Sequence, residues 1–298
     1  MIINQANLTN MYVALNTLFN AAFEGAPSFH EQIAMVVPSN GRANDYAFML
    51  QFPMLREWIG DRQIKNLAAA SFQIVNKDYE ATVEVDRNDI EDDQLGIYNP
   101  IVAELGRAAK QHPDFLVAQL LREGFVNPCY DGKPFFAPDH PVGEGVQSNT
   151  GGGSGTAWYL LDTTRAIRPL IFQRRSQPRL VRQDRPEEEH VFMRRKFRYG
   201  VDYRGAAGYG LWQLAYASRQ TLTAANYAAA RLAMTSLKNE EGIALGVRPS
   251  MLVVPPSLET QAKEILQAEL VLADQTAGGT KTNIWRGTAE LLVVPWLE

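Results

Sequence analysis

The residue types that carry most metal and nucleophile chemistry are sparse in this sequence and widely spaced. It contains four histidines, His30, His112, His140 and His190, and a single cysteine, Cys129. No two histidines have the short spacing of a metal-binding motif, and one thiol excludes an intrachain disulfide and a multi-cysteine site. We therefore predict no metal site, and the cysteine usage fits a reducing compartment.

Motifs for phosphate binding and acid–base catalysis are also missing. The glycines within 205–210 have the wrong spacing for a dinucleotide-binding loop, and the run 151–155 lacks the lysine and the helix of a phosphate loop. Asp139-His140 has the composition of an acid–base pair, but a single dipeptide in a proline-rich loop fits local hydrogen bonding better. We predict no catalytic residue and no cofactor.

The composition is that of an ordinary globular protein. The 298 residues are 46% hydrophobic and 21% charged, which excludes a disordered chain and allows one large domain or two joined ones. No apolar run approaches the roughly 20 residues that span a membrane, and the first residues lack a signal-peptide pattern. We expect a protein that is made in the cytoplasm and does not contact membranes.

Positive charge gathers in residues 165–204. This segment has twelve Lys and Arg against five acidic residues, a net charge of +7, so the rest of the chain carries −11 within a total of −4. Such asymmetry is typical of nucleic-acid contact or charge pairing between subunits, and it also arises on a solvated strand surface balanced by nearby acids. All three interpretations stay open. The candidate basic residues are Arg174, Arg175, Arg179, Arg194, Arg195 and Lys196.

One long helix dominates the pattern of the elements. Asn99-Pro100 supplies a cap residue followed by proline at the first helical position, and residues 100–123 would extend about 36 Å. Pro113 is expected to bend this helix without ending it. The apolar stripe predicted to pack inward consists of Ile101, Leu105, Ala108, His112, Leu116 and Leu120.

Strand periodicity precedes the long helix. Residues 79–86 alternate strictly between apolar and polar side chains, and residues 71–76 have the pattern of a partner strand. A turn at 76–78 would join them into a two-stranded hairpin. An isolated hairpin is marginal in water, so this one either packs on its own domain or reaches another subunit.

Regular elements are also predicted at both ends of the chain. Residues 4–23 have apolar side chains at helical spacing, and 48–58 form an aromatic-rich lead-in to the hairpin. The C-terminal part alternates helix 223–238, strand 249–255, helix 258–272 and strand 290–294, which is typical of a compact α/β unit.

Long segments of the chain resemble the Mu-like phage major head subunit family, the gpT-type capsid proteins. The resemblance lies in FQIVNKDYEATVEVDRNDIEDDQLGIYNPIVAELGR, IAMVVPSNGRANDYAFMLQFPMLREWIGDR, GFVNPCYDGKPFFAPDHPVGEG, AWYLLDTTRAIRPLIFQRRSQPRL, YGVDYRGAAGYGLWQLAYAS and RPSMLVVPPSLETQAKEIL. It implies an α+β protein with the HK97-type capsid fold, which has an N-terminal arm, an extended hairpin loop, a peripheral domain with a long spine helix, and an axial domain.

The resemblance also implies a division of the chain. Residues 1–55 would form the arm and lead-in, 56–88 the extended loop, 89–220 the peripheral domain with spine helix 100–123, and 221–298 the axial domain. The usual arrangement returns from the axial to the peripheral domain, whereas this chain stops in its C-terminal unit. The order of these two segments therefore stays open, with residues 158–217 as candidates for the peripheral role.

The implied function is that of a major capsid protein, not an enzyme. It would form hexamers and pentamers of an icosahedral head around double-stranded DNA, after assembly in the host cytoplasm. Its partners would be itself, a separate scaffold, a maturation protease, a portal, the packaged DNA through non-specific contact and, in some heads, a decoration protein. Two alternatives remain: a soluble α/β enzyme of unknown reaction, and a nucleic-acid-binding protein that uses residues 165–204.

The predicted hairpin supplies the candidate subunit contacts. Its apolar face is expected to lie across a neighbouring subunit in the shell. Some related capsids are crosslinked through a lysine of the extended loop, but nothing besides a lysine at the hairpin tip indicates this, and no crosslink is expected here. The candidate contact residues are Phe72, Ile74, Lys77, Tyr79 and Val83.

Overall fold

The computed structural model describes residues 3–46, 72–92, 95–185, 188–272 and 279–298. The predicted aromatic lead-in at 48–58 lies outside these residues, as do residues 56–71 of the span 56–88 assigned to the extended loop. Among the described helices, none has the length and apolar character required to cross a membrane.

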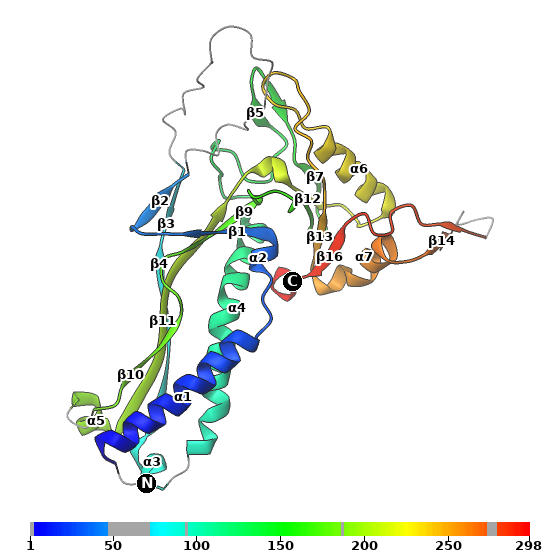
Figure 1. Cartoon of the computed structure of the whole chain (residues 1–298). Helices are drawn as coiled ribbons and strands as arrows, with labels where there is room; N and C mark the ends of the chain where they lie inside the picture. Colours follow the sequence, from blue (N-terminus) through cyan, green and yellow to red (C-terminus); the bar gives the residue numbers. More distant parts are fainter. Residues whose placement is uncertain (1–2, 47–71, 93–94, 186–187, 273–278) are drawn as a thin grey trace.

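The molecule has an elongated unit and a broader second unit (Figure 1). From here on the elongated unit is the arm, and it extends well beyond the N-terminal residues 1–55. Helices α1 (Gln5–Gly25) and α4 (Asn99–Glu123) run along the arm beside the long strand β11 (Lys196–Tyr209). The second unit carries α6 (Ala224–Thr235) and α7 (Glu259–Leu266). The predicted spine helix 100–123 is confirmed as α4, and Pro113 lies within it.

The sheet of the arm is organised around β11. On one side β11 pairs antiparallel with β4, from Lys196 opposite Asp86 to Gly205 opposite Lys77. On its other side it pairs first with β10 and then with β9, which pairs in turn with β1 in parallel. The strands of this sheet are β1 (Ala34–Pro38), β4 (Lys77–Asp86), β9 (Leu170–Arg174), β10 (Arg179–Gln183) and β11.

The predicted hairpin of residues 71–76 with 79–86 is wrong. Strand β3 (Gln73–Val75) pairs antiparallel with β2 (Ala43–Asp45), whereas β4 pairs with β11 along ten residues. Alternation is a local signal that shows a strand has one buried face, but it does not select the partner strand. The segment that links β2 to β3 contains residues 47–71, so the ladder at its base is formed by β2 and β3.

Helix α1 packs against α4 and against the part of the arm sheet that contains β10 and the start of β11. Leu8, Met11, Leu15 and Phe19 of α1 are buried together with residues of α4, β4, β10 and β11. The two helices approach closely at Gly106, where a Cβ would lie 2.5 Å from the Phe19 carbonyl oxygen. Only glycine fits this crossing without movement of the backbone.

The predicted inward stripe of the spine helix is wrong in phase at its N-terminal end. Ile101 is 46% exposed and Ala108 is exposed, while their neighbours Val102 and Ala109 are buried. Because α4 has α1 on one side and the sheet on another, its buried arc is wider than a single stripe. The buried residues are Val102, Leu105, Gly106, Ala109, Pro113, Asp114, Val117, Ala118 and Leu121.

The second unit is built on another mixed sheet, in the order β16-β13-β8-β12-β7. Its strands are β7 (Thr150–Gly153), β8 (Trp158–Leu161), β12 (Ala215–Arg219), β13 (Met251–Val254) and β16 (Glu290–Val293). Residues 158–161 and 215–217, which lie within the segment 158–217 considered for the peripheral role, belong to this sheet. The chain enters the second unit, returns to the arm for β9 to β11, and enters the second unit again.

Short elements complete the fold. The C-terminal turn η5 (Pro295–Leu297) returns to the arm, because Arg122 of α4 donates to the Trp296 carbonyl at 3.5 Å and Phe29 packs on the Trp296 ring. The C-terminal turn thus contacts α4 and the segment that precedes α2. The remaining elements are α2 (His30–Ile33), α3 (Arg87–Glu91), η2 (Leu95–Ile97), β5 (His140–Val142), β6 (Gly145–Gln147), α5 (Glu189–Arg194), η3 (Trp212–Leu214), η4 (Pro256–Leu258), β14 (Leu270–Leu272) and β15 (Thr280–Thr282).

Candidate functional site

The residues predicted to contact other subunits have different environments. Ile74 is 5% exposed, and its side chain fills the space above Gly208, where a Cβ would lie 2.3 Å from its Cδ1. Phe72 is partly buried against the main core of the same chain, and Lys77 is exposed. An outward-facing role for Ile74 is therefore wrong, while Phe72 and Lys77 remain available beside the β2–β3 ladder.

Tyr79 and Val83 also face the interior of their own chain. The Tyr79 ring stacks on Tyr203 with centroids 5.2 Å apart and meets the edge of His112 at 4.5 Å. His112 is hydrogen-bonded to the Tyr203 hydroxyl, and burial lowers the pKa of its imidazole. Val83 packs against the cluster beneath α1. These contacts fasten β4 to the spine helix, so substitutions there would test folding before assembly.

The basic residues form two groups rather than one face. Arg174 lies opposite Gly205 of β11 and Arg179 opposite Asp202, whereas Lys196 begins the same strand. Six residues separate positions 202 and 196, so the two groups are roughly 20 Å apart along the strand. The first group consists of Arg174, Arg175 and Arg179, and the second of Arg194, Arg195 and Lys196.

Acidic residues of the same chain offset part of this charge. The Glu84 carboxylate forms ion pairs with Arg198 at 2.9 Å and with Lys196 at 3.7 Å. The hydrogen bond from Arg198 is the main cause of the lowered pKa of Glu84. Arg179 lies 3.7 Å from Asp202. The interpretation of a strand surface balanced by nearby acids therefore holds for these pairs, which are exposed and contribute little stability.

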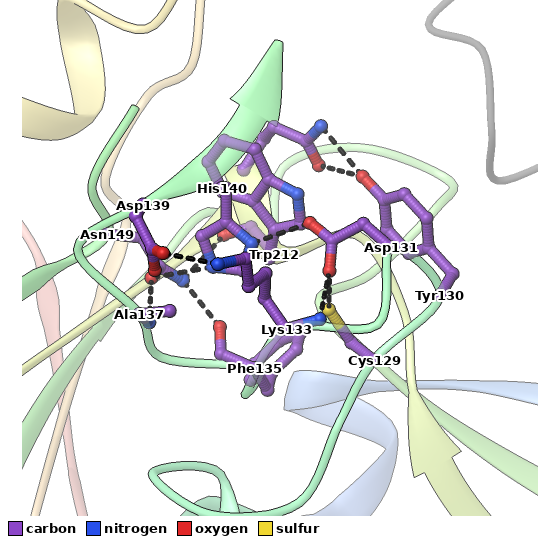
Figure 2. A network of polar contacts seen from close by, with 11 residues as sticks. Cys129, Tyr130, Asp131, Lys133, Phe135, Ala137, Asp139, His140, Asn149 and Trp212 are labelled. Atoms are coloured by element: carbon purple, nitrogen blue, oxygen red, sulfur yellow. Dashed lines mark hydrogen bonds and ion pairs between the residues drawn. The ribbon is translucent and has the colours of Figure 1, made fainter. Parts of the chain in front are cut away.

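A buried polar cluster surrounds His140 in the second unit (Figure 2). Its Nδ1 lies 2.6 Å from Asp131 Oδ2, and its Nε2 lies 3.2 Å from Asn149 Oδ1. The Asn149 amide is fixed by donating to the Phe135 carbonyl at 2.8 Å. Both ring nitrogens therefore lie against side-chain oxygens that can accept hydrogen bonds. The ring also stacks on Trp212, with the ring centroids 4.1 Å apart and an interplanar angle of 7°.

The same carboxylate also holds the single cysteine. Cys129 Sγ donates to Asp131 Oδ1 at 3.1 Å, and burial raises the pKa of this thiol far above its usual value. Burial alone would raise the pKa of Asp131, but hydrogen bonds from His140, Cys129 and the Lys133 backbone outweigh it, so the pKa is lowered. A raised thiol pKa means that the cysteine is a poor nucleophile.

This cluster can organise loops but shows no catalytic geometry. Asp139 pairs with Lys133, and His140 pairs with Asp131 and Asn149, so the prediction that these two residues form hydrogen bonds within the loop is confirmed. The ligand atoms of Cys129, Asp131 and His140 lie within 4.8 Å of one another, a donor set that metals can use. In the structure these atoms hydrogen-bond to one another instead. Spacing alone did not reveal the cluster, because loops bring its members together.

A second buried polar group ties the N-terminal segment to the spine helix. Asp114 of α4 is 1% exposed, and its Oδ1 accepts from Ser28 Oγ at 2.7 Å and from the His30 backbone nitrogen at 2.8 Å. His30 Nδ1 lies 3.0 Å from the same oxygen. One carboxylate thus caps α2 and anchors the connection between α1 and β1. The sequence pattern did not single out Asp114.

Comparison with solved structures defines the class of protein. The chain superposes on the capsid subunit in the procapsid of bacteriophage JBD30 with a TM-score of 0.83 and 40% identity, over 99% of this chain and 100% of that one. It also matches the subunit in the JBD30 capsid decorated with minor capsid protein trimers, with a TM-score of 0.78 and 33% identity, over 94% and 93% of the two chains. The fold is the HK97-type fold of phage major capsid proteins.

The sequence comparisons define the family. The major capsid protein of Escherichia phage Mu is 41% identical over 308 aligned residues, which cover 100% of both chains. The family model for the Mu-like prophage major head subunit gpT matches residues 8–297. The chain belongs to this family. Its members are structural head subunits, so the enzyme alternative no longer applies.

Proposed function

We propose that this major capsid protein assembles into hexamers and pentamers of an icosahedral head that encloses double-stranded DNA in the virion. The observation that carries the proposal is the match over the whole length to a procapsid subunit, at a TM-score of 0.83. A ring of five or six copies closes when one surface of a subunit meets a different surface of the next. Many modest contacts per copy then act together in the shell.

The subunit contacts are proposed to involve the β2–β3 ladder and the residues beside it. Phe72 and Lys77 flank β3, and the Val75 side chain is 46% exposed beside them. The outward-facing residues beside this ladder are the ones that a neighbouring copy can reach. Ile74 is buried in the main core, while Tyr79 and Val83 pack β4 against the rest of its own subunit.

Further partners are proposed from the biology of the class. A separate scaffold and a maturation protease would act before the genome enters, and a portal would occupy one vertex. Support for an outer protein comes from the JBD30 relative, whose capsid is decorated with minor capsid protein trimers. The group Arg174, Arg175 and Arg179 is proposed to face the packaged DNA, because three arginines within six residues provide a concentrated positive charge. Assembly would take place in the host cytoplasm.

Expression of the full chain with and without its scaffold, followed by negative-stain electron microscopy, tests the proposal. We expect closed shells, or rings of five and six copies, in at least one condition. If only small discrete oligomers form under both conditions, self-assembly into a head is contradicted. Circular dichroism on the same samples checks that the subunits are folded.

A further inference from the structure

The far end of the arm exposes two large apolar side chains. Phe192 and Met193 are adjacent in α5, and their exposed fractions are 80% and 70%. Their neighbour Val191 is buried in the cluster under α1, so it anchors the helix while the next two residues point away from that cluster. In Figure 1, α5 lies beside α3 at the end of the arm opposite the second unit. Adjacent exposed aromatic and thioether side chains are typical of contact surfaces.

The backbone holds this pair in place through a left-handed residue. Arg195 has φ = 56°, and it is the only non-glycine residue with positive φ in the described ranges. Its backbone nitrogen donates to the Val191 carbonyl at 2.9 Å, and its own carbonyl accepts from the Arg87 nitrogen at 2.9 Å. Helix α5 is therefore tied directly to the start of α3. Glycine would fit this conformation with less strain, so an arginine at this position indicates a use for the side chain.

Opposite charges lie at the ends of the two neighbouring helices. Arg194 and Arg195 are exposed at the C-terminal end of α5, whose first turn carries the exposed Glu189. On α3 and its C-cap, Glu91 and Asp92 are exposed, and the Glu91 carboxylate also pairs with Arg87 of the same helix at 2.9 Å. The basic, apolar C-terminal end of α5 on one copy is therefore complementary to the acidic end of α3 on another copy. Packaged DNA has one sign of charge and would not match both helix ends.

We infer that the end of the arm docks on a second copy of this chain, with α5 of one copy against α3 of the next. This inference rests on the proposed shell and names one of its contacts. Phe192 and Met193 would be buried by the neighbour, and Arg194 and Arg195 would face its Glu91 and Asp92. Because different surfaces meet, the contact is heterologous and closes into a ring when the rotation allows.

The first test replaces the apolar pair. In F192D/M193D we expect soluble subunits with an unchanged unfolding temperature, since both side chains are exposed, and a yield of shells lower by about tenfold or more. The matched control is L232D, which places an aspartate at another exposed apolar helical position, 68% exposed, in the second unit. If F192D/M193D forms normal shells while the wild type does too, the inference is overturned and the proposed function stands. If the wild type forms no shells, the proposed function itself is contradicted.

The second test exchanges the charges. R194E/R195E and E91K/D92K are each expected to reduce the yield of shells, because like charges would then meet across the contact. Combining all four changes in one chain should restore assembly, since every copy again presents opposite charges on the two helices. Unfolding curves of the isolated subunits show whether the combined changes restore the stability of each single chain or the contact between copies. Shells that form normally from both charge variants, or a combined variant that stays defective, would overturn the contact.

Discussion

At the residue scale, the single carboxylate of Asp131 serves two buried partners. Its two oxygens accept from His140 at 2.6 Å and from Cys129 at 3.1 Å, and the resulting pKa is lowered despite burial. A lowered folded-state pKa stabilises the fold at pH values above the carboxyl pKa of the unfolded chain. That contribution is lost as the pH falls through the lower pKa of the folded state.

We therefore predict a pH-dependent cost for D131N. At pH 7 the free energy of unfolding should fall by about 1–3 kcal/mol, since a buried imidazole and a thiol lose a charged acceptor. The difference from wild type should start to shrink as the pH drops below about 4, the usual carboxyl pKa of an unfolded chain, and should vanish as the pH passes the lowered pKa of the folded Asp131. Urea unfolding of D131N and wild type, at pH 7 and at a pH below about 4, measures this difference in the free energy of unfolding. The matched control D139N removes a half-exposed ion pair with Lys133 and should cost less than about 1 kcal/mol. An equal deficit for D131N at both pH values would contradict the role assigned to its charge.

At the element scale, the crossing of α1 and α4 depends on one missing side chain. A Cβ at Gly106 would lie 2.5 Å from the Phe19 carbonyl oxygen and 3.2 Å from Ala22 Cβ. We predict that G106A lowers the free energy of unfolding by about 1–3 kcal/mol, because the helices must separate. G25A is the control, since nothing lies within 4 Å of its new Cβ, and its stability should stay equal or rise by up to about 1 kcal/mol. Thermal unfolding of both variants compares them, and equal stability would show that the helices adjust freely.

The helices and strands also show which features of the fold a local sequence pattern can predict. The cap at Asn99-Pro100 and the alternation of residues 79–86 are local signals, so the spine helix and strand β4 could be predicted. The partner of β4 could not, because β11 lies more than a hundred residues later and alternation carries no partner information. The His140 cluster was missed for the same reason: Asn149 and Trp212 reach it from separate segments.

At the scale of the whole molecule, the two basic groups lie at different places on the arm and are predicted to have different roles. Replacing Arg174, Arg175 and Arg179 with glutamine should leave shell formation intact and lower the amount of packaged DNA, because phosphate neutralisation is lost. K263Q/K281Q/R286Q, which removes three charges from the second unit, is the control. DNA content per purified particle is the measurement. Wild-type packaging by the arginine variant would assign these residues to surface balance instead of genome contact.

The long ladder between β4 and β11 also affects the protein during its synthesis. Asp86 pairs with Lys196, 110 residues later in the chain, so β4 leaves the ribosome well before its partner exists. At about 5–20 residues per second, the delay is roughly 6–22 s. During that time the apolar faces of α1 and β4 lack the sheet that covers them in the finished subunit. The yield of folded subunits should therefore depend on translation speed and on chaperones that shield a nascent chain.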